Sequence, residues 1–225
     1  MTELTVLMPC LNEEKSIGFC IREALDCIEK HNISAEILIA DNGSSDSSVN
    51  IAKSLGARVV HIEKRGYGAA LIGGINEANG KYIIMGDCDG SYDFSMLDKF
   101  LEKLREGYSL VVGNRFHGGI ESGAMPLSHK IGVPFLSAAA KLRYRAPVGD
   151  FHCGLRGFER ETALSLDLHH SGMEFATEII ARFAKAEKRI CEIPTPLRRD
   201  LRNGKSHLRT FRDGIRHLKF ILTNK

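Results

Sequence analysis

Short apolar runs alternate along the chain with segments whose apolar residues recur at helical spacing. The runs are rich in Val and Ile and lie at residues 4–9, 36–40, 57–62, 81–86 and 108–114. Such runs predict strands that are buried on both faces. The helical segments carry Ile17, Ile21, Leu25 and Ile28, then Val49, Ile51, Ala52 and Leu55, and then Leu97, Leu101 and Leu104. This alternation predicts an α/β fold with a mostly parallel central sheet and helices on both faces.

Size and composition favour one folded unit. A chain of 225 residues with 43% hydrophobic content can bury one sizeable core, and no repeat or long linker marks a boundary. No run approaches the ~18 apolar residues that span a bilayer, and no signal segment opens the chain, so we expect a soluble or peripheral protein. The six cysteines form no C-x-x-C pair, which favours reduced cytoplasmic thiols over a disulfide framework or a zinc module.

Polar residues follow four of the predicted strands directly. The segments are "PCLNEEKS" after the first strand, "DNGSSDSS" after the second, "GDCDGSYD" after the fourth and "GNRFHGG" after the fifth. In sheets of this kind, ligands bind outside the carboxyl ends of the strands. The four segments therefore predict a binding site at one edge of the sheet.

The acidic pair Asp87 and Asp89 is the most specific chemical signal in these segments. Carboxylate oxygens are the ligands that Mg²⁺ and Mn²⁺ prefer, and phosphate oxygens complete the shell of such ions. The pair therefore predicts a metal site that holds a diphosphate. Ordinary turn aspartates are the alternative interpretation, since Asp and Gly are common in turns. The other polar strand ends favour the functional interpretation.

Two other nucleotide-binding classes lack their motifs. A dinucleotide-binding sheet needs a glycine-rich turn after its first strand, and this chain has "PCLNEE" there. The glycine-rich "RGYGAALIGG" follows the third strand instead. The lysine motif of P-loop ATPases and kinases is also absent from the sequence.

Six motifs together resemble one enzyme family over nearly the whole chain. They are "VLMPCLNEEKSI", "ADNGSSDSS", "RGYGAALIGGINEANGKYIIMGDCDGSYDF", "VVGNRF", "DFHCGLRGFER" and "EIPTPLRRDLRNGKSHL". In this order and spacing they resemble family 2 glycosyltransferases with the GT-A fold, close to the polyprenyl-phosphate (dolichol-phosphate) mannosyl and glucosyl transferases. The resemblance implies a Rossmann-like half that binds a nucleotide sugar.

The resemblance also implies roles for residues on the donor side. Pro9, Asn12, Glu13 and Cys88 would hold the nucleotide, and Asp41 would read its base and ribose. Arg65 and Gly68, in the loop before the third helix, would lie beside it. Asp87 and Asp89 would bridge Mg²⁺ or Mn²⁺ to the diphosphate. Ser91 stands where the family often has Gln, so either Asp93 or water is expected to supply the remaining metal ligand.

Basic residues carry the implied acceptor side. Arg199, Arg202, Lys205 and Ser206 resemble a loop that closes over the donor and acceptor phosphates, and Arg115 and Lys130 are candidates for the acceptor phosphate. Asp150, Gly154 and Arg156 keep a motif that adjoins the sugar and phosphate in relatives. The candidate catalytic residues are Asp89, Arg115, Arg199 and Arg202. We expect packing or phosphate contact, not catalysis, from His152 and Cys153.

No general-base motif of the family follows "GLRGFER". The segment "GMEFATEII" supplies Glu174 and Glu178 instead, and Glu178 is expected to orient arginines or to lie on a helix surface. A phosphate acceptor is already ionised near neutral pH and needs no strong protein base. The missing motif therefore favours a lipid-phosphate acceptor.

The final residues predict an amphipathic basic helix. Its stripe holds Leu208, Phe211, Ile215, Leu218 and Leu222, with Arg209, Arg212, Arg216 and Lys219 alongside. Such a helix suits an anionic membrane interface, and packing of the stripe onto the domain is the alternative. We divide the chain into a GT-A domain at residues 1–207 and this helix at residues 208–225. Relatives often continue into transmembrane helices, so truncation, a membrane partner subunit and a soluble acceptor all remain open.

Together these features predict an inverting, metal-dependent transfer of a hexose from a nucleotide sugar to an isoprenoid phosphate. The resemblance favours a UDP-sugar over GDP-mannose, and it places the protein in the cytoplasm, at the cytosolic membrane face. We expect no nucleic-acid partner. The alternative is the same fold with a soluble acceptor such as a secondary metabolite. A nucleotide-sugar-binding protein without turnover is disfavoured by the intact acidic pair and the arginine-rich loop.

Overall fold

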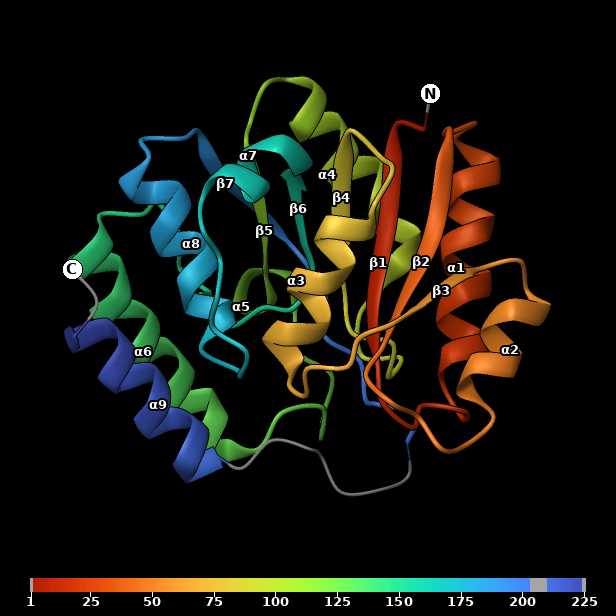
Figure 1. The fold of residues 1–225 in the computed structure, drawn as a ribbon. Coiled ribbons are helices and arrows are strands. Elements are labelled where there is room, and N and C mark those ends of the chain that lie inside the picture. The colour runs from red at the N-terminus through yellow and green to blue at the C-terminus, as the bar shows by residue number, and fades with distance from the viewer. Residues whose placement is uncertain (1, 203–209, 224–225) are drawn as a thin grey trace.

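The chain folds around a central sheet. Figure 1 shows a computed structural model that describes residues 2–202 and 210–223, without the side chains of residues 210–213. The strands of this described part are β1 (Leu4–Cys10), β2 (Ala35–Asp41), β3 (Arg58–His61), β4 (Tyr82–Met85), β5 (Leu110–Asn114), β6 (Arg156–Glu159) and β7 (Ile190–Pro194). Their order is β3-β2-β1-β4-β6-β5-β7, and only β6 runs antiparallel to its neighbours.

The register of the parallel strands brings their carboxyl ends to one edge. Cys10 at the end of β1 pairs with Asp41 at the end of β2, and Leu7 of β1 pairs with Met85 at the end of β4. The loops that follow β1, β2 and β4 therefore leave the sheet side by side. This is the edge at which the sequence predicts the site.

Helices cover both faces of the sheet. They are α1 (Ile17–Lys30), α2 (Ser48–Ser54), α3 (Tyr67–Glu77), α4 (Leu97–Arg105), α5 (Arg115–Gly118), α6 (Leu127–Tyr144), α7 (Arg160–Ser165), α8 (Phe175–Lys185) and α9 (Thr210–Thr223), with a 3₁₀ turn η1 (Phe94–Met96). Helix α3 packs in front of β1 and β2 in Figure 1, and α1 and α4 lie behind the sheet. The apolar spacing predicted for α4 is confirmed, because Leu97, Leu101 and Leu104 are buried on one face of this helix.

The predicted fold class is confirmed. Each of the five predicted strands is present within about two residues of its expected bounds. The short strands β6 and β7 and the helix α6 were not predicted. One detail of α1 differs, since Leu25 is exposed and the buried face instead uses Cys20, Ala24 and Cys27.

Helix α9 packs beside α6 and against α8 (Figure 1). Its contact face holds His217, Phe220 and Ile221, which are buried. The described side chains of the predicted apolar stripe do not pack onto the domain, because Ile215 is 65% exposed and Leu222 is 70% exposed. Leu208 and Arg209 lie outside the described residues, as do the side chains of Phe211 and Arg212. The helix thus has an apolar face toward the domain and a second apolar face toward solvent.

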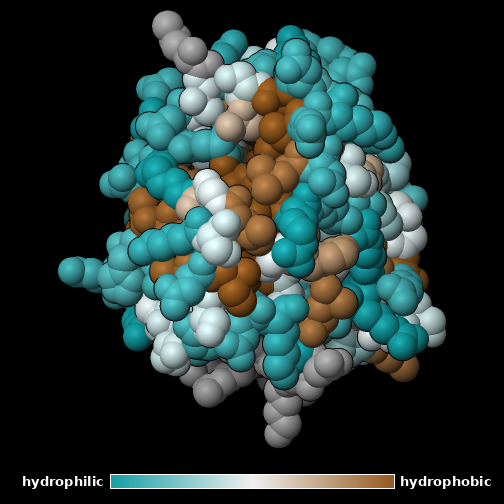
Figure 2. All heavy atoms as spheres, turned by 90° about the vertical axis from the view of Figure 1, so that its right-hand side faces the viewer, coloured by the Kyte–Doolittle hydropathy of each residue, from teal (hydrophilic) through white to brown (hydrophobic). Residues whose placement is uncertain are grey.

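Much of the remaining surface is hydrophilic. Figure 2 shows the side that carries α2 and the edge strand β3, where a hydrophobic strip lies between hydrophilic borders. Within residues 2–202 and 210–223, no helix combines the length and apolarity needed to cross a bilayer.

Candidate functional site

The loops after β1 and β2 hold each other at the edge of the sheet. The side-chain oxygen of Asn12 accepts a hydrogen bond from the backbone N–H of Ser45 at 2.8 Å. The backbone N–H of Glu13 donates to Ser48 Oγ at 2.7 Å. Asn12 has φ of 58°, a left-handed conformation that Asn tolerates better than most residues. Asn12 and Glu13 are therefore fixed in place before any ligand binds.

Asp41 ends β2 as a well-satisfied carboxylate. It accepts hydrogen bonds from the backbone N–H groups of Gly43 and Ser44 at 3.1 and 3.0 Å, and it lies 3.1 Å from His61 Nδ1. Burial alone would raise its pKa, but the bonds from Ser44, His61 and Gly43 lower the pKa below its usual value. Asp41 thus stays ionised and can accept further hydrogen bonds from a ligand.

Arg65 and Gly68 follow β3 at the same edge. The Arg65 guanidinium donates to the backbone carbonyl of Asn42, so it lies beside the loop after Asp41. The sequence predicted Gly68 in the loop before the third helix, but it lies in the first turn of α3. A Cβ at Gly68 would lie 2.1 Å from the carbonyl oxygen of His170. Glycine is needed there because the backbone of the 170–172 segment packs directly on the helix.

Three carboxylates and one guanidinium form an acidic centre after β1 and β4. Arg202 pairs with Asp89 and also with Glu13, whose Oε1 lies 3.1 Å from Arg202 Nη1. Burial and the neighbouring Asp89 raise the pKa of Asp87 to about 6. Burial also raises the pKa of Glu13 to about 7, although Arg202 acts against this rise. Carboxylates that resist ionisation in this way form a site that favours a cation.

Ser91 and Asp93 have supporting positions. Ser91 donates to Asp89 Oδ1 through its backbone N–H at 2.9 Å and its hydroxyl at 2.6 Å, so it orients Asp89. Asp93 accepts from Ser95 and lies 2.6 Å from Arg198. Among the described residues, neither Asp93 nor Glu13 forms with Asp87 and Asp89 a group in which one oxygen from each lies within 4.8 Å of the others. Glu13 shares the Arg202 guanidinium with Asp89, whereas Asp93 pairs with Arg198, so we take Glu13 and not Asp93 as the third carboxylate of the centre.

Cys88 lies beneath this centre and Pro9 beside it. The Cys88 thiol is buried and donates to the Pro9 carbonyl at 3.2 Å. This contact ties the end of β1 to the loop after β4. The structure thus gives Cys88 a packing role and leaves it little surface for a nucleotide.

The segment from Arg198 to Arg202 crosses over the acidic loop. The backbone N–H of Leu201 donates to the Asp89 carbonyl at 2.8 Å, and that of Arg198 donates to the Ser91 carbonyl at 2.9 Å. Arg198 also pairs with Glu23 at 2.8 Å, a contact that the sequence did not indicate. Arg199 points elsewhere, toward Glu121, and its side chain is largely exposed.

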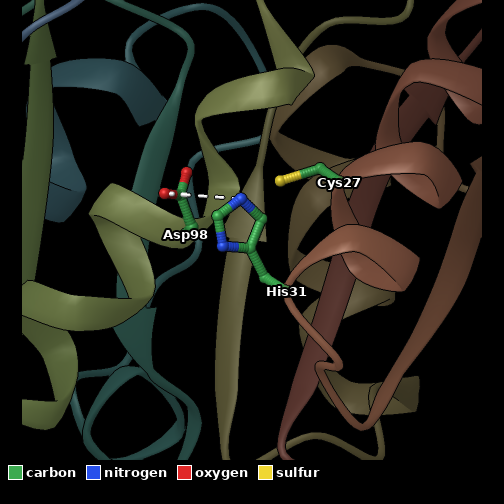
Figure 3. Close-up of side chains that lie close together, drawn as sticks. All are labelled: Cys27, His31 and Asp98. Carbon is green, nitrogen blue, oxygen red and sulfur yellow. Dashed lines mark ion pairs between the residues drawn. The ribbon is translucent and has the colours of Figure 1, made fainter.

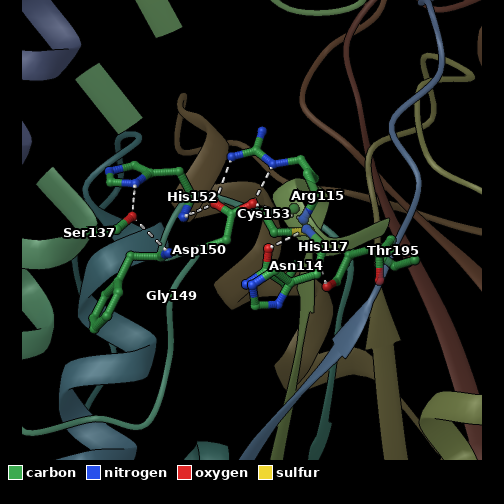
Figure 4. Close-up of polar contacts among 12 residues, drawn as sticks. Asn114, Arg115, His117, Ser137, Gly149, Asp150, His152, Cys153 and Thr195 are labelled. Carbon is green, nitrogen blue, oxygen red and sulfur yellow. Dashed lines mark hydrogen bonds and ion pairs between the residues drawn. The ribbon is translucent and has the colours of Figure 1, made fainter. Parts of the chain in front are cut away.

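The predicted acceptor side is built on a buried ion pair (Figure 4). Arg115 Nε and Nη2 donate to the two carboxylate oxygens of Asp150 at 2.7 and 2.8 Å. Glu192 accepts the backbone N–H groups of Gly149 and Asp150 at 2.6 and 2.9 Å. The Ser137 hydroxyl lies 3.4 Å from His152 Nδ1. Glu192 also accepts from the Asn114 side-chain amide at 3.1 Å, and it gave no signal in the sequence because all these partners are distant along the chain.

Several predicted acceptor residues do not share this location. Arg156 is fully buried, and its donors go to the carbonyls of Phe151, Cys153 and Ala176 at 2.6 to 2.8 Å. This placement argues against direct acceptor contact, since the guanidinium instead holds the turn below Asp150. Lys130 is exposed in the first turn of α6. Lys205 and Ser206 lie outside the described residues.

Glu178 neither orients arginines nor lies on a helix surface, so both expectations for it are wrong. It is fully buried in α8 and accepts from the backbone N–H of His170 at 3.0 Å and from His170 Nδ1 at 2.7 Å. With His169 it forms a compact cluster that could hold a metal ion. Arg182 contacts His169 and disfavours a cation there.

A further cluster joins Cys27, His31 and Asp98 between α1 and α4 (Figure 3). His31 Nε2 lies 3.7 Å from Asp98 Oδ2, and the Cys27 thiol donates to the Ser95 carbonyl at 3.4 Å. Burial raises the pKa of Cys27, which keeps the sulfur protonated and unsuited to metal binding. His31 and Asp98 line a shallow pocket that does not reach Asp87 or Asp89.

Comparisons with known proteins decide the family. The glycosyl transferase family 2 pattern matches residues 5–164. The chain belongs to this family. The low-salt glycan biosynthesis hexosyltransferase Agl6 of Haloferax volcanii is 38% identical over 223 residues, which cover 98% of this chain and 53% of that protein. The dolichyl-phosphate hexose transferase of the same organism is 32% identical over 94% of this chain and 89% of its own length.

Solved structures share the fold of this chain. Glucosyl-3-phosphoglycerate synthase from Mycobacterium tuberculosis superposes with a TM-score of 0.75 at 20% identity, covering 98% of this chain and 80% of that one. One of its structures contains Mn²⁺, UDP and phosphoglyceric acid. The likeness confirms the predicted GT-A fold. This family 2 chain spans only about half the length of Agl6.

Proposed function

We propose that this family 2 chain transfers a hexose from a nucleotide sugar to a polyprenyl phosphate, with inversion and with Mg²⁺ or Mn²⁺ as cofactor. A UDP-sugar is favoured over GDP-mannose as the donor. The observation that carries this proposal is the acidic centre of Glu13, Asp87 and Asp89, which lies at the carboxyl ends of the parallel strands.

On the donor side, Asp41 and the loops around Asn12 and Arg65 would hold the nucleoside. Asp87 and Asp89 would hold the metal ion, since hard cations bind carboxylate oxygens and the charge of Asp89 helps to raise the pKa of its half-buried neighbour Asp87. When bound, the ion supplies positive charge to the diphosphate that leaves the sugar. Arg202 lies near enough to Asp89 to contribute a second positive charge.

The buried carboxylates support an acceptor that needs no general base. Asp150 forms an ion pair with Arg115, and Glu178 pairs with His170. Glu192 accepts hydrogen bonds from two backbone N–H groups. None of these three is a free base toward a hydroxyl group. A phosphate oxygen is ionised at neutral pH and can attack the sugar directly. The 32% identity to the Haloferax dolichyl-phosphate hexose transferase supports the same acceptor class.

A lipid acceptor also requires access to a membrane, and the paired helices α6 and α9 supply a suitable face. We call it the α6–α9 surface: it comprises the exposed side chains of Leu127, Ile131, Phe135, Leu142, Ile215, Leu218 and Leu222. Exposed cations on the same two helices are Lys130, Lys141, Arg143, Arg216 and Lys219. Helix α6 contains no acidic residue. Apolar residues among cations favour an anionic bilayer, so we place the protein in the cytoplasm, peripheral to the cytosolic membrane face, alone or with a membrane partner subunit.

The proposal is tested with radiolabelled nucleotide sugars and Mn²⁺ or Mg²⁺, with and without a short polyprenyl phosphate. We expect label from one UDP-sugar to enter the organic phase only when the lipid is present. Label transferred to a water-soluble acceptor, and never to the lipid, would contradict the acceptor assignment. Failure of every donor to bind would contradict the proposal as a whole.

A further inference from the structure

Arg202 occupies the position in the acidic centre that a bound cation would need. Asp89 Oδ1 is already used, because it accepts the backbone N–H and the hydroxyl of Ser91 at 2.9 and 2.6 Å. Asp89 Oδ2 is the oxygen left for a metal ion, and it is the atom that pairs with Arg202. The second guanidinium nitrogen of Arg202 pairs with Glu13 at 3.1 Å.

The guanidinium is held there by its own segment. The Leu201 N–H binds the Asp89 carbonyl at 2.8 Å, one residue before Arg202. Gly90 faces Leu201 so closely that a Cβ at this glycine would lie 2.7 Å from the leucine side chain. With only 20% of its side chain exposed, Arg202 is well screened from water. Its ion pairs are therefore stronger than those of a surface arginine.

Charge balance explains why a cation is needed there. Glu13, Asp87 and Asp89 bring three carboxylates into a largely buried space. Negative charges that are gathered in a largely buried space repel one another unless a positive group lies between them. A divalent ion bound to Asp89 Oδ2 would lie directly beside the Arg202 guanidinium, and two cations so close repel strongly, so the two compete for this oxygen.

We propose that Arg202 is the resident cation of the acidic centre, and that a divalent metal binds only as this guanidinium moves away from Glu13 and Asp89. This inference rests on the proposed function, since the metal with a nucleoside diphosphate is the ligand that displaces Arg202. The released guanidinium carries its charge to the diphosphate oxygens, its new partners. Metal alone therefore binds weakly, and metal and nucleotide bind cooperatively.

The test measures Mn²⁺ binding by the loss of the free-ion electron paramagnetic resonance signal, with and without UDP. The variant is Arg202→Gln, and the matched control is Arg199→Gln, which removes the same charge from the same segment but away from Asp89. Without UDP, we expect Arg202→Gln to bind Mn²⁺ roughly tenfold more tightly than the wild type or more. We expect Arg199→Gln to change the affinity less than about twofold. UDP should tighten Mn²⁺ binding more in the wild type than in Arg202→Gln.

Two outcomes overturn the inference. One is an Arg202→Gln protein, folded by circular dichroism, that binds Mn²⁺ no more tightly than the wild type. The other is an equal gain in Arg199→Gln, which would show a general effect of charge. Arg202→Lys, which keeps a cation, should bind Mn²⁺ as weakly as the wild type. Mn²⁺ binding requires no acceptor, so the two proposals can fail separately. If Arg202→Gln tightened Mn²⁺ binding as expected but the wild type formed no lipid-linked product, the proposed function would be refuted and the role of Arg202 would stand.

Discussion

The buried ion pair of Arg115 and Asp150 should be far more important for stability than an exposed ion pair of the same groups. The Arg115 side chain is 10% exposed and that of Asp150 is 0% exposed. Asp150→Asn keeps the volume but removes the charge, and it directs an amide N–H group toward a guanidinium that can only donate. Breaking one half of a buried ion pair costs about 3–5 kcal/mol, because the remaining charge stays desolvated.

Urea denaturation measures this loss. With an m-value of roughly 1–3 kcal/mol/M, a loss of that size lowers the unfolding midpoint by about 1 M or more. The control is Glu3→Gln, which breaks the exposed pair with Arg105, where the Arg105 and Glu3 side chains are 54% and 29% exposed. That change should cost no more than about 1 kcal/mol. If Asp150→Asn cost no more than Glu3→Gln, the buried pair described here would be refuted.

Three further predictions use other parts of the chain. Gly68→Ala should destabilise the protein by about 1–3 kcal/mol, because its Cβ would lie 2.1 Å from a backbone oxygen. Gly132→Ala, in the open part of α6, should be neutral or stabilising, and equal losses of stability in urea denaturation would contradict this. Burial and the positive charges nearby hold the pKa of His152 well below 6.5. The unfolded chain then binds a proton that the native His152 does not, so the contribution of His152 to stability falls as pH drops below 6.5 and is constant above it. Between pH 7 and pH 5, His152→Asn should lose about 2 kcal/mol less stability than the wild type, and an unchanged pH slope would contradict this. Phe135→Ser should weaken flotation with anionic vesicles several-fold, whereas Phe19→Ser, on α1, should not; equal losses would contradict the α6–α9 surface.

The sequence predicted the elements that have strong local patterns. The strands β1, β2 and β4 are continuous apolar runs, and their polar ends indicated the site directly. The strand β6 has only four residues and contains a buried Arg, so no apolar run marks it. Helix α6 contains Pro134 and exposes many of its apolar residues, which hides its helical pattern.

The contacts within the site could not be predicted in the same way. Arg202 is 113 residues from Asp89 in the sequence, and Arg115 is 35 residues from Asp150. Such pairs depend on how the strands and loops are arranged in space. Arg156 shows the opposite error, since its motif indicated an acceptor residue, whereas the fold buries it and directs its three guanidinium nitrogens to backbone carbonyls.

The most direct test of the central claim compares wild-type protein with Asp89→Asn for lipid-linked product. Both are incubated with the preferred nucleotide sugar, Mn²⁺ and a polyprenyl phosphate, and organic-phase label is counted over time. The account predicts product from the wild type, none with a chelator, and a roughly 100-fold or greater loss of rate in Asp89→Asn, since a charge that stabilises the leaving diphosphate is gone. Wild-type rates from Asp89→Asn would contradict it.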